Sequence, residues 1–221
     1  VAVFAARLFD AHEAWLENRP HDALRIADRV ATNVPSLPAA ARADALEQLW
    51  PMYVDLGQLD RAEELMATGD DAAERRGGEA IIATYREDQG RLRATLARSY
   101  PKLEDARRLA TPFIEAGLVK ESRRLVALHQ AAASRSHLLT QYLRMLEGGL
   151  AMIEGRPDAA IERFDEFLAN RGTLPHPSRE ARVRRWLADA LMAKGEVTRA
   201  IEVLESAPPR LINVMSRPLG S

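Results

Sequence analysis

The sequence lacks cysteine, long apolar runs and the pattern of an export signal. None of the 221 residues is cysteine, so disulfides, thiol catalysis and cysteine metal ligands are excluded. No run of about 18 uncharged apolar residues occurs, so the sequence offers no membrane-spanning helix. The opening VAVFAARLFDAHEAW has no basic start and meets a charge early, which is not the pattern of a signal peptide.

Lysine and aromatic residues are also scarce, and the net charge is close to zero. Three of the 31 basic residues are lysine, which leaves 28 arginines, and the formal net charge is −1. A balanced charge provides no basic field for nucleic acid or for an anionic membrane. Hydrophobic residues make up 47% and aromatic residues 5%, with alanine abundant, which favours closely packed helices. The arginine and alanine bias indicates a GC-rich bacterial genome, and we expect a cytoplasmic domain of a longer polypeptide, because residue 1 is valine.

Apolar residues recur at helical spacing along the chain, and no alternation with period two indicates a strand. Glycine and proline divide the pattern into helical segments, and Gly77-Gly78 is interpreted as a helix stop. One long helix is predicted over 79–99 and a further helix over 119–133. The predicted domain covers 1–207, with a tail over 208–221 and helical hairpins near 2–34, 39–76, 79–117, 136–172 and 178–207.

The hairpins share an alanine early in their second helix, where a larger side chain would push the paired helix away. The turns LENRPHDAL, LGQLDRAEE, IEGRPDAAI and KGEVTRAIE align on this alanine. The five aligned positions are spaced by 39, 44, 54 and 40 residues. Such periodicity is typical of a helical solenoid, in which each hairpin buries its apolar face on its neighbours. The aligned alanines are Ala23, Ala62, Ala106, Ala160 and Ala200.

At these positions the chain resembles the tetratricopeptide-repeat (TPR) family over most of Phe4 to Ala207. The residues that carry the resemblance are Gly148, Gly155, Ala160 and Phe164; Tyr53, Gly57 and Ala62; and Ala23, Ala27 and Pro35. The resemblance implies an all-α, right-handed α-solenoid of about five hairpins and about 11 helices. The units are longer than the family's usual length of about 34 residues, and the helix near 119–133 is an extra element.

If the resemblance holds, the first helix of each hairpin lines a concave groove. Arginines in that groove could hold acidic groups through forked hydrogen bonds, or they could be solvated or paired with neighbouring acids. The carboxylate-clamp pattern of chaperone-binding members is not matched, since Leu8 and His12 stand in the first hairpin. The predicted partner-binding residues are Asp44, Glu47, Arg91, Arg98, Tyr142, Met145, Arg182 and Arg185.

No residue pattern indicates catalysis, a metal or a cofactor. The five histidines show no HExxH spacing, and His129 and His137 could share a face only on a continuous helix. No glycine-rich phosphate loop is present, and no histidine has neighbours spaced for a catalytic triad.

Two functions remain open from the sequence. The first is a non-enzymatic scaffold whose groove binds a peptide, a partner domain or another part of its own polypeptide. The second is a ligand-sensing or regulatory segment of a larger bacterial signalling protein, such as a kinase or transcriptional regulator. Nucleic acid and membrane partners are not expected, and an oligomer stays open.

Overall fold

The computed structural model describes residues 2–17, 19–69, 72–99, 103–133, 137–170 and 177–206. The expected all-α solenoid is confirmed: these residues form helices and turns, with no strand among them. None of the described helices combines the length and apolarity needed to cross a membrane. The helices are α1 (Ala2–Leu16), α2 (Pro20–Ala31), the short 3-10 helix η1 (Val34–Ser36), α3 (Ala39–Asp55), α4 (Leu59–Ala67), α5 (Ala72–Tyr85), α6 (Gln89–Ser99), α7 (Leu103–Glu115), α8 (Val119–Ala133), α9 (His137–Ile153), α10 (Pro157–Ala169), α11 (Pro177–Ala193) and α12 (Val197–Glu205).

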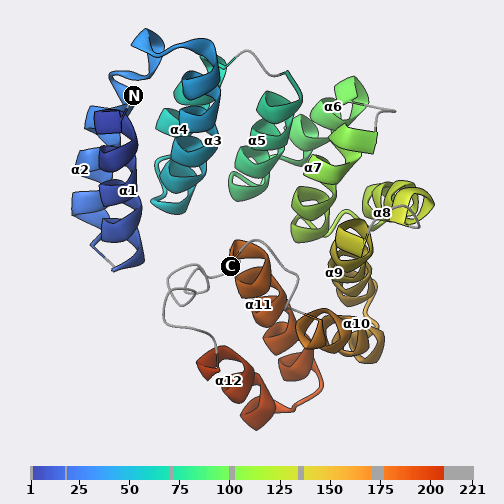
Figure 1. The fold of residues 1–221 in the computed structure, drawn as a ribbon. Coiled ribbons are helices and arrows are strands. Elements are labelled where there is room, and N and C mark those ends of the chain that lie inside the picture. The colour runs from blue at the N-terminus through green and yellow to red at the C-terminus, as the bar shows by residue number, and fades with distance from the viewer. Residues whose placement is uncertain are drawn as a thin grey trace.

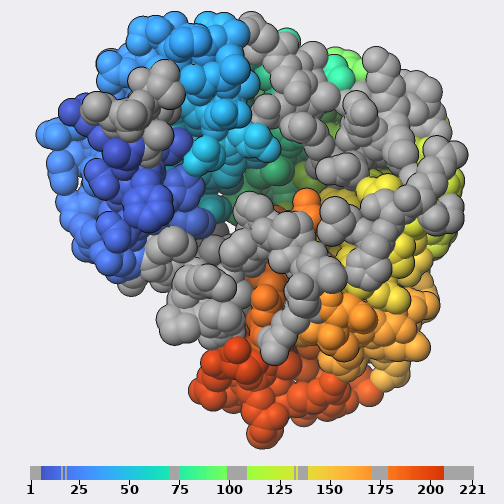
Figure 2. Space-filling view, in the orientation of Figure 1, coloured from blue at the N-terminus to red at the C-terminus, as the bar shows by residue number. Residues whose placement is uncertain are grey.

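The helices pack as successive antiparallel pairs, from α1 with α2 to α11 with α12. The pairs follow one another around an arc, on which α7, α9 and α11 lie on the inner side while α8, α10 and α12 lie towards the outside (Figure 1). The same order is visible on the surface, from the blue N-terminal helices to the red α12 (Figure 2). Contacts between α5 and α7, and between α7 and α9, continue the stack from one hairpin to the next.

Four of the hairpin turns share the same backbone conformation, with a glycine in the left-handed region after the first helix. Gly57, Gly117, Gly155 and Gly195 have φ between 67° and 79°. The next residue then donates its backbone N–H to a carbonyl five residues earlier, as Arg156 does to Ala151 at 2.9 Å. This 6→1 bond satisfies an orphan carbonyl at the helix end, and glycine suits the left-handed position because it has no Cβ.

The turn between α5 and α6 has the same geometry without a glycine. Glu87 occupies the left-handed position with φ 55°, and Asp88 donates to the carbonyl of Ala83 at 2.8 Å. The long helix predicted over 79–99 is therefore wrong, since α5 ends at Tyr85 and α6 begins at Gln89. The predicted stop at Gly77-Gly78 is also wrong, because both residues lie inside α5 and a Cβ on Gly78 would clash with Met66 of α4.

This missed turn changes the pairing of the central helices. The helix expected near 119–133 is present as α8, and it pairs with α7 in a complete hairpin. Ala106 lies in α7, a first helix, and is not equivalent to the other anchors. The equivalent fourth position of every second helix is 0 to 2% exposed: Ala23, Ala62, Leu92, Ser122, Ala160 and Ala200. Their spacings are 39, 30, 30, 38 and 40 residues.

Replacing Glu87 by glycine should raise the free energy of unfolding by about 0.5–1 kcal/mol, because a Cβ in the left-handed region is strained. Urea unfolding followed by circular dichroism measures the change. Glu87→Ala is the matched control, since it removes the carboxylate but keeps the Cβ, and we expect little gain from it. An equal gain from both variants would show that charge, not backbone strain, is responsible.

Buried apolar residues form two clusters that meet at α5. The N-terminal cluster extends from Leu8 to Met66 and includes Ile82, whereas Ala83 belongs to the cluster that reaches α12. Ion pairs add links between neighbouring hairpins, such as Arg93 to Glu121 at 3.0 Å. These pairs are largely exposed, so we assign the stability of the arc to the apolar contacts.

Several predictions fall on residues outside the described ranges. These are the break at 134–136, most of the linker at 173–178 and the tail at 208–221. The extent of a single domain over 1–207 stays a prediction.

Candidate functional site

The inner side of the arc brings together charged and aromatic side chains from α7, α9 and α11. Glu115, the last residue of α7, accepts a hydrogen bond from Nε of Arg182 at 3.0 Å and from Nη2 of Arg185 at 3.1 Å. Both arginines lie on α11, and one complete hairpin, α9–α10, separates α11 from the α7–α8 hairpin along the chain. Helices α7 and α11 therefore meet across α9, and we call Glu115, Tyr142, Arg182 and Arg185 the inner cluster.

Gly149 of α9 permits this close approach. A Cβ at Gly149 would lie 2.8 Å from Cζ3 of Trp186 on α11 and 2.9 Å from Cγ2 of Ile114 on α7. Trp186 and Ile114 are both fully buried, so they occupy the space that a side chain at position 149 would need. The absence of a side chain on this face of α9 allows its two neighbouring first helices to pack over it.

Tyr142 of α9 forms the aromatic part of the inner cluster. Its hydroxyl lies 3.3 Å from the Thr111 hydroxyl of α7, and its ring centroid lies 5.3 Å from that of His129. The guanidinium of Arg179 stands 5.1 Å from the ring centroid, at cation–π distance. The ring is thus held by three helices while part of it remains accessible.

The electrostatics of the inner cluster leave an excess of positive charge. Two guanidinium groups share one carboxylate, and the exposed side-chain fractions are 12% for Glu115, 30% for Arg182 and 17% for Arg185. Burial lowers the pKa of Arg182, but the charge and hydrogen bond of Glu115, together with smaller effects of Tyr142 and Tyr85, outweigh it and raise that pKa. Burial raises the pKa of Asp189, although the charge of Arg185 acts in the opposite direction. Arg182 therefore remains charged at neutral pH.

Two polar atoms beside the inner cluster have no hydrogen-bond partner among the described residues. They are Nε of Arg185 and Oδ2 of Asp189, and both atoms are buried. Unpaired buried polar atoms are uncommon in folded proteins, and they are frequently satisfied by a ligand or by water.

The structure places the sequence-predicted residues on several surfaces. Tyr142, Arg182 and Arg185 come together, whereas Asp44 and Glu47 are exposed on α3. Met145 is fully buried, so it cannot contact a partner.

The two remaining predicted residues, Arg91 and Arg98, lie on α6, which is a second helix and not the first helix that the prediction assumed. Arg91 pairs with Glu63, and Arg98 pairs with Glu79 at 2.6 Å. The missed turn at Glu87 is the reason for their wrong assignment to a groove-lining helix. All four predicted arginines are thus paired with acids that are distant from them in the sequence.

The described residues contain no group of three or more acidic or histidine side chains that could hold a metal ion. His129 is buried, and its Nδ1 lies 3.1 Å from the carbonyl of Leu125 within the same helix. His129 belongs to α8 and His137 begins α9, so a shared face on one continuous helix does not exist.

Residues 151–211 match the family model described as tetratricopeptide repeat. This part of the chain belongs to the tetratricopeptide-repeat family. The match covers α10, α11 and α12, including the inner-cluster arginines, and the TPR resemblance of the sequence is thereby confirmed.

Two solved structures are similar to this chain over most of its length. Both contain nearly identical TPR-like repeats of a putative kinesin light chain from Podosopora anserina. One is a single-residue variant with 21% identity and a TM-score of 0.42, covering 92% of each chain. The other has 20% identity and a TM-score of 0.41, covering 96% of this chain and 94% of that chain. None of the curated proteins matches the chain.

Proposed function

We propose that the protein is a non-enzymatic interaction module that binds a peptide, a partner domain or another part of its own polypeptide on the inner side of the arc. TPR folds generally mediate protein–protein interactions and are typically scaffolds without catalytic activity. The observation that carries the proposal is the inner cluster, in which α7 and α11 meet across α9 and present two arginines to one carboxylate.

The charge of the inner cluster indicates the kind of group that binds there. Arg182 donates one hydrogen bond to Glu115 through Nε and keeps further N–H donors, and its side chain is 30% exposed. Tyr142 supplies an aromatic surface beside it, and Arg179 adds a third positive charge. An acidic side chain or a terminal carboxylate of the partner would accept hydrogen bonds from the remaining N–H donors of Arg182. The arginine-rich and alanine-rich composition is consistent with a bacterial protein, and we propose a cytoplasmic setting for this interaction.

Affinity capture tests this function. The wild type should retain a specific partner from an extract of the native cells, and Arg182→Gln should reduce that retention about tenfold, because a charge-assisted hydrogen bond is lost. Arg185 still pairs with Glu115 in this variant, so the fold should persist, as circular dichroism can check.

Arg199→Gln is the matched control. Arg199 is also paired with an acid, Asp165 at 2.6 Å, but it lies on the outer helix α12. Capture should survive this substitution. A partner that is lost equally from both variants, or that is indifferent to Arg182→Gln, would contradict binding at the inner cluster.

A further inference from the structure

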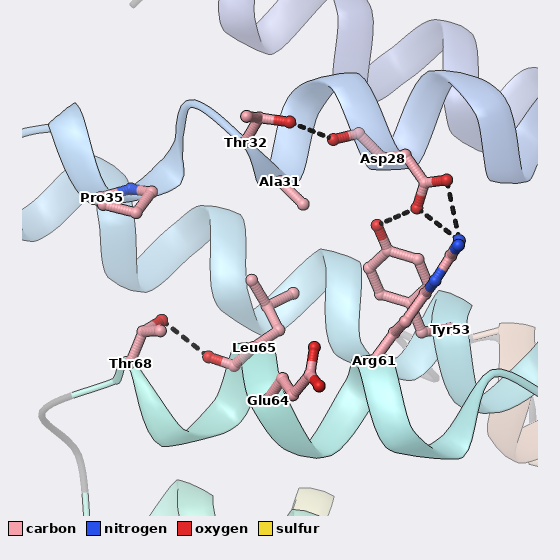
Figure 3. Close-up of a pocket in the computed structure, with 9 residues that line it drawn as sticks. All are labelled: Asp28, Ala31, Thr32, Pro35, Tyr53, Arg61, Glu64, Leu65 and Thr68. Atoms are coloured by element: carbon pink, nitrogen blue, oxygen red, sulfur yellow. Dashed lines mark hydrogen bonds and ion pairs between the residues drawn. The ribbon is translucent and has the colours of Figure 1, made fainter.

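A second concave site lies between the second helices of the first two hairpins, away from the inner cluster. A pocket of about 390 Å³ separates α2 from α4, a volume within the range of ligand-binding pockets. Figure 3 shows Leu65 and Glu64 pointing from α4 towards α2, with Ala31 facing them and Pro35 at one end. The pocket therefore has an apolar wall on both helices.

The hydroxyl groups that line the pocket are already used by the backbone. Thr32 donates to the carbonyl of Asp28 at 2.7 Å, and Thr68 donates to the carbonyl of Leu65 at 2.7 Å (Figure 3). The O–H group of each threonine therefore already donates a hydrogen bond and does not require one to a ligand.

Asp28 and Arg61 form an ion pair that lines the pocket. Asp28 accepts a hydrogen bond from the Tyr53 hydroxyl at 2.9 Å, and both of its oxygens lie 2.8 Å from Nη1 of Arg61 (Figure 3). Asp28 and Arg61 cancel each other's charge. This ion pair therefore contributes no net charge to the pocket.

Glu64 supplies the net charge of the pocket. It is exposed, it lines the pocket, and no cation pairs with it among the described residues. Its neighbour Glu63 differs, since it pairs with Arg86 at 2.9 Å and with Arg91. The pocket thus combines apolar walls with one unpaired carboxylate, and its formal charge is −1 with Asp28, Arg61 and Glu64 counted.

We propose that this pocket binds a lysine side chain of a protein partner, at an interface separate from the inner cluster. The apolar stem of lysine would lie along Leu65, Ala31 and Pro35, and its ammonium group would pair with Glu64. A neutral apolar side chain would leave the carboxylate unused, and an acidic one would be repelled by it. Charge and shape together select a long side chain with a single positive end.

The test uses the capped peptide acetyl-Ala-Lys-Ala-amide and nuclear magnetic resonance titration of the full chain. We expect amide shifts concentrated at residues of α2 and α4 around the pocket. The matched peptide with norleucine in place of lysine should bind about fivefold more weakly, because it keeps the stem but lacks the charge. Glu64→Gln should abolish the difference between the two peptides.

Glu162→Gln is the control, since Glu162 is an exposed glutamate on α10 outside the pocket. The preference for lysine should be unchanged in this variant. Equal binding of the two peptides to the wild type, or shifts spread over the whole surface, would overturn the proposal. Tighter binding of spermidine than of the lysine peptide would overturn the assignment to a side chain of a protein.

Discussion

Replacing Gly148 by alanine should lower the free energy of unfolding by about 2 kcal/mol, as overpacking of a dense core does. A Cβ at this position of α9 would stand 2.7 Å from Cδ1 and 3.0 Å from Cζ of Phe164. Phe164 on α10 is fully buried and cannot swing away, so α9 and α10 would have to separate. Alanine stabilises a helix by about 1 kcal/mol relative to glycine, and the expected loss of about 2 kcal/mol already includes this gain.

Gly90→Ala is the matched control for this prediction. Gly90 lies near the start of α6 and is exposed, and a Cβ there would meet only Oδ1 of Asp88 at 3.4 Å. The same substitution should therefore be neutral or stabilising in α6. Adding Phe164→Leu to Gly148→Ala should restore part of the lost stability by vacating the ring position. Urea unfolding of the four proteins measures these changes, and a stable Gly148→Ala variant would contradict the packing described.

Replacing Trp186 by alanine should lower the free energy of unfolding by about 3–5 kcal/mol, the range of large aromatic deletions from a core. Trp186 is fully buried, and its ring lies over the bare backbone of Gly149 and 6.1 Å from the ring of Phe164. Its removal would leave a cavity where α9, α10 and α11 converge. The variant should also lose the contact of α11 with α7, because Trp186 fills the space between them.

Met192→Ala on the same helix is the control for the tryptophan deletion. Met192 is 53% exposed, so its truncation removes little buried area and should change stability by less than about 0.5 kcal/mol. Thermal unfolding followed by circular dichroism distinguishes the two variants. Similar losses from both would show that α11 is destabilised as a helix and that the packing of Trp186 contributes little.

Where a glycine marks a turn, the sequence predicts the end of the helix before it. Gly57, Gly117, Gly155 and Gly195 each stand at a left-handed position, and the hairpins around Gly57, Gly155 and Gly195 could be recognised. The α7–α8 hairpin around Gly117 was missed, because α7 was paired with the helix predicted over 79–99. Glu87 adopts the same conformation against its own preference, since the helices on either side pack well enough to hold it there. Because no glycine marks this turn, the sequence predicted one helix over 79–99 in place of α5 and α6.

The inner cluster could be predicted only in part. Helical spacing placed Arg182 and Arg185 on one face, and the repeat placed Tyr142 on a neighbouring first helix. Glu115 was missed because its contact with α11 spans 67 residues and depends on how tightly the hairpins curve. Only the structure shows that α7 and α11 meet over Gly149.

The most direct test of partner binding on the inner side is photo-crosslinking in the native cells. Benzoylphenylalanine replaces Tyr85 in one variant and Phe9 in another, since both aromatic residues are exposed, at 45% and 69%. Tyr85 ends α5 and lies close enough to Arg182 to contribute to the raised pKa of that arginine, whereas Phe9 lies on α1. We predict a discrete adduct from position 85 and none from position 9. An adduct from position 9 alone, or equal adducts from both positions, would contradict an inner-side binding surface.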